Sequence, residues 1–196
     1  EQITQNAVID MQYHYQMLEA MNVLDNGMLN IHIGGAYGDK ANALKRFHKN
    51  IQILPSEIKR KMTLENDDKT YHVEETLKTC EKENIPMVLD YHHHMANPTT
   101  EELITFLPRI FQTWETTSYK PKVHISSPKA ENAYRSHADY VSLDFILPFL
   151  TMAKEINQDF DVMIEAKQKN LAMLRLIEEI ASIRGVKRIS GATLEW

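Results

Sequence analysis

The chain has one cysteine, Cys80, so an internal disulfide framework is excluded and a reducing compartment is favoured. It also has no apolar run near the roughly 20 residues that cross a bilayer. The formal net charge of −5 gives no overall basic field for nucleic acid, although bound divalent cations would add positive charge that side-chain counting misses. The first residues follow a helical pattern and not that of a signal peptide, so we expect a protein that is neither secreted nor membrane-inserted.

Short apolar segments alternate with amphipathic ones along the 196 residues, a length that suits a single domain, 1–196. The segments expected to be strands are 28–35, 61–67, 86–92, 122–127 and 161–167. The segments expected to be helices are 3–23, 39–54, 71–84, 99–115, 142–156 (with a kink near Pro148) and 170–183. This alternation predicts an α/β protein with a parallel sheet and helical crossovers.

Each expected strand ends on a side chain that can bind metal or act in catalysis. The clearest example is PMVLDYHHHMANP, 86–98, where an apolar run meets Asp90 and three consecutive histidines. A barrel brings the carboxyl ends of its strands to one mouth, whereas a doubly wound sheet spreads them along an edge. We therefore expect a (β/α) TIM-type barrel. It would be incomplete, with about five C-terminal βα units of eight and the first strands upstream of Glu1.

Imidazole and carboxylate groups of this kind are the usual ligands of zinc, manganese and iron. The candidates are enough for two or more ions that share bridging carboxylates: His32, Glu65, Asp90, His93, His124, His137 and Glu165. Clustered metals stabilise the attacking and leaving oxygens of a phosphoryl displacement. The residues alone thus predict a metal-dependent hydrolase, most naturally of a phosphate ester.

Simpler interpretations exist for several of these residues. A single histidine at a strand end is usually a hydrogen-bonded structural group, and Glu65 in LENDD is also placed to begin a helix. His92 and His94 fit as neighbours of one true ligand between them. The glycines of HIGGAYGDK do not match the phosphate-loop or dinucleotide fingerprints, and their expected role is to let the backbone turn beside the metal site.

Six segments in order closely resemble the UV damage endonucleases of bacteria and fungi: HIGGAYGDKANALKRF, LENDD, LDYHHH, KVHISSPK, HADYV and MIEAK. The resemblance runs from about Gln12 to the final helix. It implies a TIM barrel related to endonuclease IV, and a metal cluster usually taken as Mn²⁺, with Zn²⁺ and Co²⁺ also compatible. It further implies nicking of UV-damaged double-stranded DNA on the 5′ side of cyclobutane dimers, 6-4 photoproducts and some abasic sites. We expect no membrane or protein partner, and a cytoplasmic location in a bacterium or a nuclear one in a eukaryote.

The resemblance also assigns roles to residues. The seven metal candidates match family ligands, and His93 is favoured within its run because the related nucleases use an Asp-x-x-His spacing, here Asp90 to His93. Lys122 matches a family lysine that can be carbamylated at the metal site. The expected catalytic group is thus Lys122, His137 and Glu165, and the expected DNA contacts are Lys129 and Arg135.

The chain departs from the family pattern at its start. Family members carry an earlier barrel portion that supplies a further histidine ligand and the residues that wedge into DNA, and nothing in this chain matches it. We therefore expect weak or no nicking by these residues alone. Two other classes remain open: a metal-dependent sugar isomerase or epimerase on the same barrel, and an inactive metal-binding fragment.

Overall fold

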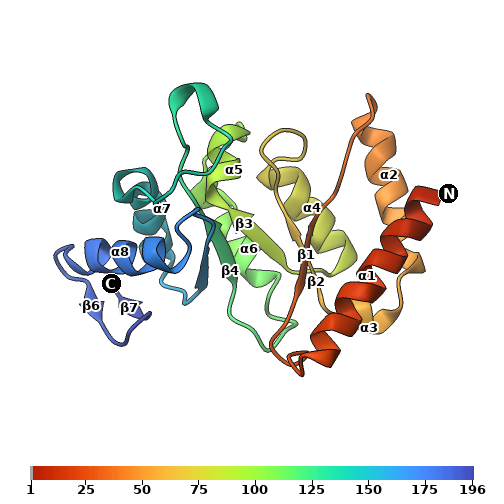
Figure 1. The fold of residues 1–196 in the computed structure, drawn as a ribbon. Coiled ribbons are helices and arrows are strands. Elements are labelled where there is room, and N and C mark those ends of the chain that lie inside the picture. Colours follow the sequence, from red (N-terminus) through yellow and green to blue (C-terminus); the bar gives the residue numbers. More distant parts are fainter. Residues whose placement is uncertain (1) are drawn as a thin grey trace.

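Five parallel strands form the centre of the molecule, as the computed structural model of residues 2–196 shows (Figure 1). The strands follow one another across the sheet in chain order: β1 (Leu29–His32), β2 (Met62–Glu65), β3 (Met87–Asp90), β4 (Lys122–Ile125) and β5 (Asp161–Ile164). Every neighbouring pair is parallel. All five carboxyl ends therefore lie at the same edge of the sheet.

Helices connect the strands and cover the sheet. Their bounds are α1 (Gln2–Ala20), α2 (Lys40–Asn50), α3 (Ser56–Lys59), α4 (Val73–Glu83), α5 (Tyr91–Ala96), α6 (Leu107–Gln112), α7 (Leu143–Ile156) and α8 (Asn170–Ala181). Figure 1 shows α1 to α4 on the β1 side and α7 and α8 on the β5 side. A small antiparallel pair, β6 (Lys187–Arg188) and β7 (Leu194–Glu195), lies beside α8.

The core forms where the sheet meets its helical layer. All residues of β2 and β3 are buried, and α4 and α6 pack against β3. Leu77 of α4, Leu89 of β3 and Ile110 of α6 are fully buried in one contiguous cluster. Parallel strands covered in this way are mostly apolar, as in the run Met87–Leu89 before Asp90, whereas β2 alternates Met62 and Leu64 with the buried polar residues Thr63 and Glu65.

The predicted α/β class, the parallel sheet and all five strand positions are confirmed, but two predicted elements differ. The strand predicted over 86–92 ends at Asp90, because Asp90 caps a short helix, α5, that begins at Tyr91. The helix predicted over 99–115 is reduced to a 3₁₀ turn at Leu103–Thr105 and α6, with Pro108 in the first turn of α6. The helix predicted over 142–156 is confirmed as α7, which runs from Leu143 to Ile156 with Pro148 inside it.

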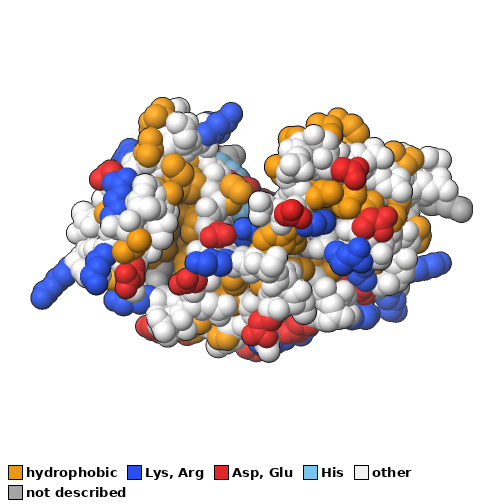
Figure 2. Space-filling view, turned by 90° about the horizontal axis from the view of Figure 1, so that it is seen from below, with side chains coloured by type: hydrophobic (Ala, Val, Ile, Leu, Met, Phe, Trp, Pro, Cys, Tyr) orange, Lys and Arg blue, Asp and Glu red, His pale blue; other side chains and the backbone are white. Residues whose placement is uncertain are grey.

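The sheet is open, with β1 and β5 as its two edges, so the described residues do not close the predicted barrel. Val162 and Met163 on the β5 edge are exposed. Figure 2 shows the molecule from below, with a hollow between its two sides, hydrophobic side chains along the walls and a histidine visible in its depth. No helix within residues 2–196 has the length and apolarity needed to cross a membrane.

Candidate metal centre

The carboxyl edge of the sheet gathers the predicted site residues. Backbone register places His32 of β1 opposite Glu65 of β2, and Asp90 of β3 opposite His124 of β4. Glu165 follows β5 directly, and its amide donates to the carbonyl of Ile125 over 2.9 Å. Residues from five separate segments therefore meet because parallel strands end together.

Two groups of ligand-type atoms form at this edge. His32, Glu65 and His93 make the first group, and in each group the ligand atoms lie within 4.8 Å of one another. The second group contains Glu65, Asp90, His124 and Glu165. Because Glu65 belongs to both groups, its carboxylate is placed to bridge two cations.

The two oxygens of Glu65 face different histidines. Oε1 lies 3.3 Å from Nδ1 of His93, and Oε2 lies 3.3 Å from Nδ1 of His124. On its other side, His124 Nδ1 lies 3.1 Å from Oε1 of Glu165. The centre is thus a chain of alternating carboxylates and imidazoles, and Glu65 is its middle member.

Mutual attraction shifts the pKa values of these groups. Burial raises the pKa of Glu65, but the adjacent His124 and His93 outweigh it and hold that pKa well below its usual range. Burial works in the opposite direction on the histidines, yet neighbouring carboxylates raise the pKa of His93 to about 9 and that of His124 to about 10. Without a metal, protons on these imidazoles therefore supply the positive charge that the carboxylates require.

Asp90 is fully buried, and only part of its carboxylate is paired. Oδ1 accepts from the His93 amide over 2.7 Å, which caps α5, while Oδ2 has no hydrogen-bond partner among the described residues. Burial is the main reason that the pKa of Asp90 rises to about 7. Nδ1 of His124 also has no partner in hydrogen-bonding geometry within residues 2–196. Two buried ligand-type atoms that lack a hydrogen bond in one cluster of carboxylates and imidazoles fit a divalent cation, which satisfies such groups at once.

Backbone carbonyls orient two of the candidate ligand histidines. Nδ1 of His32 lies 3.2 Å from the carbonyl oxygen of Glu65, and Nδ1 of His93 lies 3.0 Å from that of Asn66. A carbonyl only accepts, so in each neutral ring the proton is on Nδ1 and the lone pair is on Nε2. Carbonyl contacts of this type fix the tautomer of metal-binding histidines.

Asn66 supports the centre in a way that the sequence did not predict. Its fully buried side chain bonds to both the amide and the carbonyl of Asp90, and so ties the end of β2 to the end of β3. Asn30 plays a related part, since its Nδ2 donates to Oε2 of Glu65 and its Oδ1 accepts from Thr63 over 2.8 Å. The only sequence signal was the position of Asn66 directly after a ligand, and that position equally suited a helix cap.

The remaining predicted residues lie outside these two groups. His137 is outside both, with Nδ1 3.9 Å from Oε2 of Glu165. Lys122 lies at the amino end of β4, where its Nζ donates to Asp161 over 2.9 Å. Lys129 and Arg135 lie on the loop after β4, and Arg135 is 3.6 Å from Asp68 of the β2–α4 loop.

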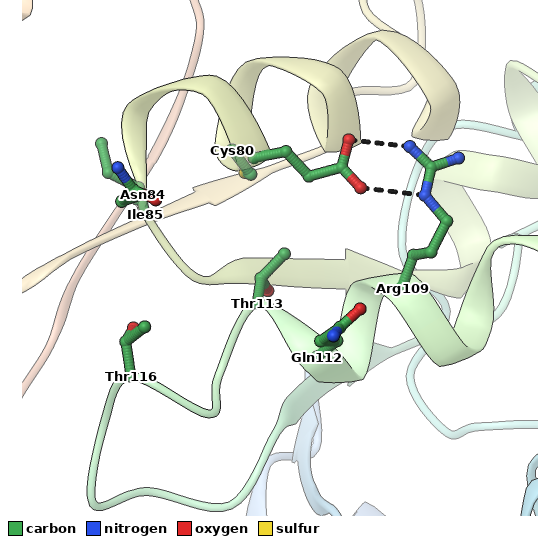
Figure 3. A pocket seen from close by; sticks show the side chains of 8 residues that line it. Cys80, Asn84, Ile85, Arg109, Gln112, Thr113 and Thr116 are labelled. Carbon is green, nitrogen blue, oxygen red and sulfur yellow. Dashed lines mark hydrogen bonds and ion pairs between the residues drawn. The ribbon is translucent and has the colours of Figure 1, made fainter.

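A pocket of about 200 Å³ lies away from this edge, between α4 and α6 (Figure 3). Asn84, the C-cap that follows α4, and Thr113 after α6 line it, and both are near the amino end of β3. Arg109 forms a bidentate ion pair with Glu81 across its upper side (Figure 3). Cys80 and Glu81 of α4 also line this pocket, but Glu81 is already paired with Arg109, and the described residues form no group of three or more candidate ligands there, unlike at the carboxyl edge.

Fold and site together define an α/β protein with a histidine–carboxylate centre at the carboxyl ends of a parallel sheet. A family model described as "UV-endonuclease UvdE" matches residues 1–196, and the chain belongs to that family. It is 59% identical over 194 residues to the "UV DNA damage endonuclease" of Bacillus cereus (strain G9842) and 61% identical to that of Bacillus mycoides (strain KBAB4). Each match covers 99% of this chain and 61% of the relative.

The solved structure "Crystal Structure of SacUVDE" is similar, with a TM-score of 0.78 and 26% sequence identity. The match covers 93% of this chain and 61% of that chain. The chain thus spans less than two thirds of the length of the relatives that it matches. The resemblance expected from the six sequence motifs is confirmed by the family match and by the close relatives.

Proposed function

We propose that this chain forms the metal-binding part of a DNA repair endonuclease. The reaction would be hydrolysis of the phosphodiester bond 5′ to UV photoproducts, namely cyclobutane dimers and 6-4 photoproducts, and at some abasic sites. The observation that carries the proposal is the shared position of Glu65 in two ligand groups, since a pair of cations suits an in-line phosphoryl displacement. The names of the relatives support the choice of UV-damaged double-stranded DNA as the partner.

The ligand set fits a divalent cluster of Mn²⁺, with Zn²⁺ or Co²⁺ as alternatives, because these ions accept imidazole and carboxylate ligands together. The proposed ligands are His32, Glu65, Asp90, His93, His124, His137 and Glu165. When bound, such cations acidify a water nucleophile and offset the charge of the reacting phosphate.

The side chains of the centre have different proposed roles. Glu65 and Glu165, which both contact His124, hold the centre together from two sides. His137 lies at its margin, where it is placed to bind the phosphate as well as the centre. Lys122 stays in the proposed catalytic group on the strength of the family resemblance, although its Nζ must leave Asp161 to reach the ligands.

DNA would approach along the carboxyl edge, and the loop after β4 would bind its phosphates. Lys129 makes no ion pair among the described residues, so its charge is available to a phosphate. Arg135 is already 3.6 Å from Asp68, and we propose that it exchanges this partner for DNA. The positive charge of bound cations would offset the acidic balance of the chain.

We also propose that residues 1–196 form one domain of a TIM-type barrel that further strands complete. The single contiguous core supports one domain. The exposed apolar residues of β5 and the open edge of β1 support closure by additional strands, because open sheet edges are normally paired or covered.

Elemental analysis combined with a nicking assay tests the function. The purified chain is loaded with Mn²⁺, and its metal content is measured beside its cleavage of UV-irradiated supercoiled plasmid. Glu65→Gln should lower metal content and any cleavage together, whereas the control Glu74→Gln, on the exposed face of α4, should change neither. Unchanged metal content in Glu65→Gln would remove Glu65 from the ligand set.

The same assay separates the alternatives. Metal binding without cleavage, even when the missing barrel portion of a relative is added, would favour an inactive metal-binding fragment. Isomerisation of a sugar by a chain that ignores irradiated duplex would favour the isomerase class.

A further inference from the structure

His92 lies two residues after the proposed ligand Asp90 and directly before the proposed ligand His93, and it is the fully buried member of the histidine run. Both of its ring nitrogens have partners. Nδ1 lies 2.7 Å from Oγ of Ser126, and Nε2 lies 2.6 Å from the carbonyl oxygen of Tyr134. Both partners belong to the segment between β4 and α7, residues 126–142, which we call the His137 loop.

These two contacts fix one arrangement of protons. The carbonyl of Tyr134 only accepts, so Nε2 of His92 donates to it. Nδ1 then holds the lone pair of the neutral ring and accepts from the Ser126 hydroxyl. His92 therefore has no nitrogen free for a cation, which distinguishes it from His93.

The ring of His92 also packs against the residue that the loop presents to the centre. Its centroid lies 5.6 Å from that of His137, and Tyr134 and Phe145 each lie 5.7 Å away. Within the loop, the Lys129 amide donates to the Ser136 carbonyl over 2.7 Å, so the backbone pairs on itself just before His137. His92 thus contacts the start of the loop, its middle and its functional residue.

We propose that His92 is a positioning residue that holds the His137 loop in place and so sets His137 beside Glu165. It acts from α5, the same short helix that carries His93, so one helix orders residues on both sides of the centre. The importance of this positioning for DNA cleavage rests on the proposed function. The positioning itself is a property of the chain alone and is tested without metal or DNA.

Hydrogen exchange and imidazole NMR on the metal-free chain provide the test. His92→Phe keeps an aromatic ring against Tyr134 and Phe145 but removes both nitrogens. We expect at least tenfold faster exchange of the Ala138 amide, which donates to Ser127 over 2.9 Å, and shifted ring resonances of His137. His32 resonances should stay in place, because His32 contacts β2 and not this loop.

His94→Phe is the matched control, since it makes the same change at the next position of the same helix. His94 is buried, and its Nδ1 has no partner among the described residues. The control should leave exchange of the Ala138 amide and the His137 resonances unchanged even if it lowers global stability.

Two milder variants keep the test decisive if His92→Phe does not fold. Ser126→Ala removes one of the two hydrogen bonds and should give a smaller change in the same direction. His92→Gln keeps a donor that reaches the Tyr134 carbonyl and should restore part of the protection at Ala138.

The proposal would be overturned if the Ala138 amide exchanged its hydrogen as slowly in both His92→Phe and Ser126→Ala as it does in the unaltered chain. An equal effect of His94→Phe would also overturn it, because the change would then come from general disturbance of α5. Failure to bind Mn²⁺ would instead contradict the proposed function and leave these readouts intact, so the two failures are distinguishable.

Discussion

Asn66 and Asp90 are joined by two reciprocal hydrogen bonds, each of 2.9 Å. The side-chain amide of Asn66 pairs with the backbone of Asp90 in the way that the backbone of a neighbouring strand would. The Asn66 Nδ2 donates to the carbonyl of Asp90, and the Asp90 amide donates to Oδ1 of Asn66. This pair fixes where β3 ends, and therefore where Asp90 and His93 begin to face the centre.

Replacing Asn66 by Ala should lower both stability and metal affinity. The change leaves two buried backbone groups unsatisfied at about 1–3 kcal/mol each, and loss of a group that supports metal ligands typically costs about 10–100-fold in affinity. Urea denaturation and Mn²⁺ titration measure the two effects. Asn97→Ala is the control, because Asn97 makes a single side-chain bond, to the Asp67 carbonyl, and should leave metal affinity unchanged. Equal metal affinity in Asn66→Ala would contradict this role.

Stability of the metal-free chain should fall as pH rises above neutrality. His93 and His124 have folded pKa values of about 9 and about 10, above the ordinary 6.5. Their contribution to the free energy of unfolding is fully present below pH 6.5 and is lost as pH rises through 9 to 10. Denaturation with a chelator present, from about pH 6 to about pH 10, measures the trend. Glu65→Gln should make the free energy of unfolding depend less steeply on pH. A free energy of unfolding that rises with pH in the unaltered chain would contradict the raised pKa values of His93 and His124.

Metal affinity should change with pH in the opposite direction. A cation displaces the protons that His93 and His124 carry in the metal-free centre, so Mn²⁺ binding should tighten as pH rises toward 9. Calorimetry in buffers of different ionisation enthalpy measures the number of protons released. Binding with no proton release at about pH 7 would show that the ion binds elsewhere.

Saturating Mn²⁺ should raise the melting temperature of the chain. A ligand that binds only the folded state at about 100 times its Kd adds about 2.7 kcal/mol of stability. Thermal unfolding with and without Mn²⁺ measures the shift, and a chelator should reverse it. The same shift in Glu65→Gln would contradict a central role for Glu65.

Lys129→Ala should weaken binding of duplex DNA and reduce its salt dependence. Each lost phosphate contact lowers the slope of log affinity against log salt by about 0.9. Fluorescence anisotropy at several salt concentrations measures this slope. Lys120→Ala is the matched control, because Lys120 pairs with Asp159 at the amino end of the sheet, and it should leave the slope unchanged. No difference between the two variants would remove Lys129 from the DNA surface.

The strands and the convergence of their ends could be predicted because both depend on local pattern. The apolar run that stops at Asp90 and the alternating segment that stops at Glu65 indicate buried strands, and parallel neighbours end at the same edge of the sheet. The helix α5 was missed because its six residues are too few to show a helical period. The helix expected over 99–115 was too long because the pattern of apolar residues continues through a 3₁₀ turn and Pro108.

The supporting contacts of the centre could not be predicted in the same way. Asn66 reaches a backbone 24 residues away, and His92 reaches Ser126 and Tyr134 at separations of 34 and 42 residues. Such contacts depend on how loops fold over the finished sheet, and no periodicity in one sequence records them. Likewise, the alternative in which Glu65 begins a helix is excluded only by the structure, where Glu65 ends β2 with both of its oxygens facing histidines and the next helix begins at Val73.

Anomalous diffraction from crystals of the Mn²⁺-loaded protein tests the central claim most directly. We expect two manganese peaks about 3.5–4 Å apart, with the carboxylate of Glu65 between them. One peak would be bound by His32 and His93, and the other by Asp90, His124 and Glu165. A single ion, or ions bound away from Glu65, would contradict the account.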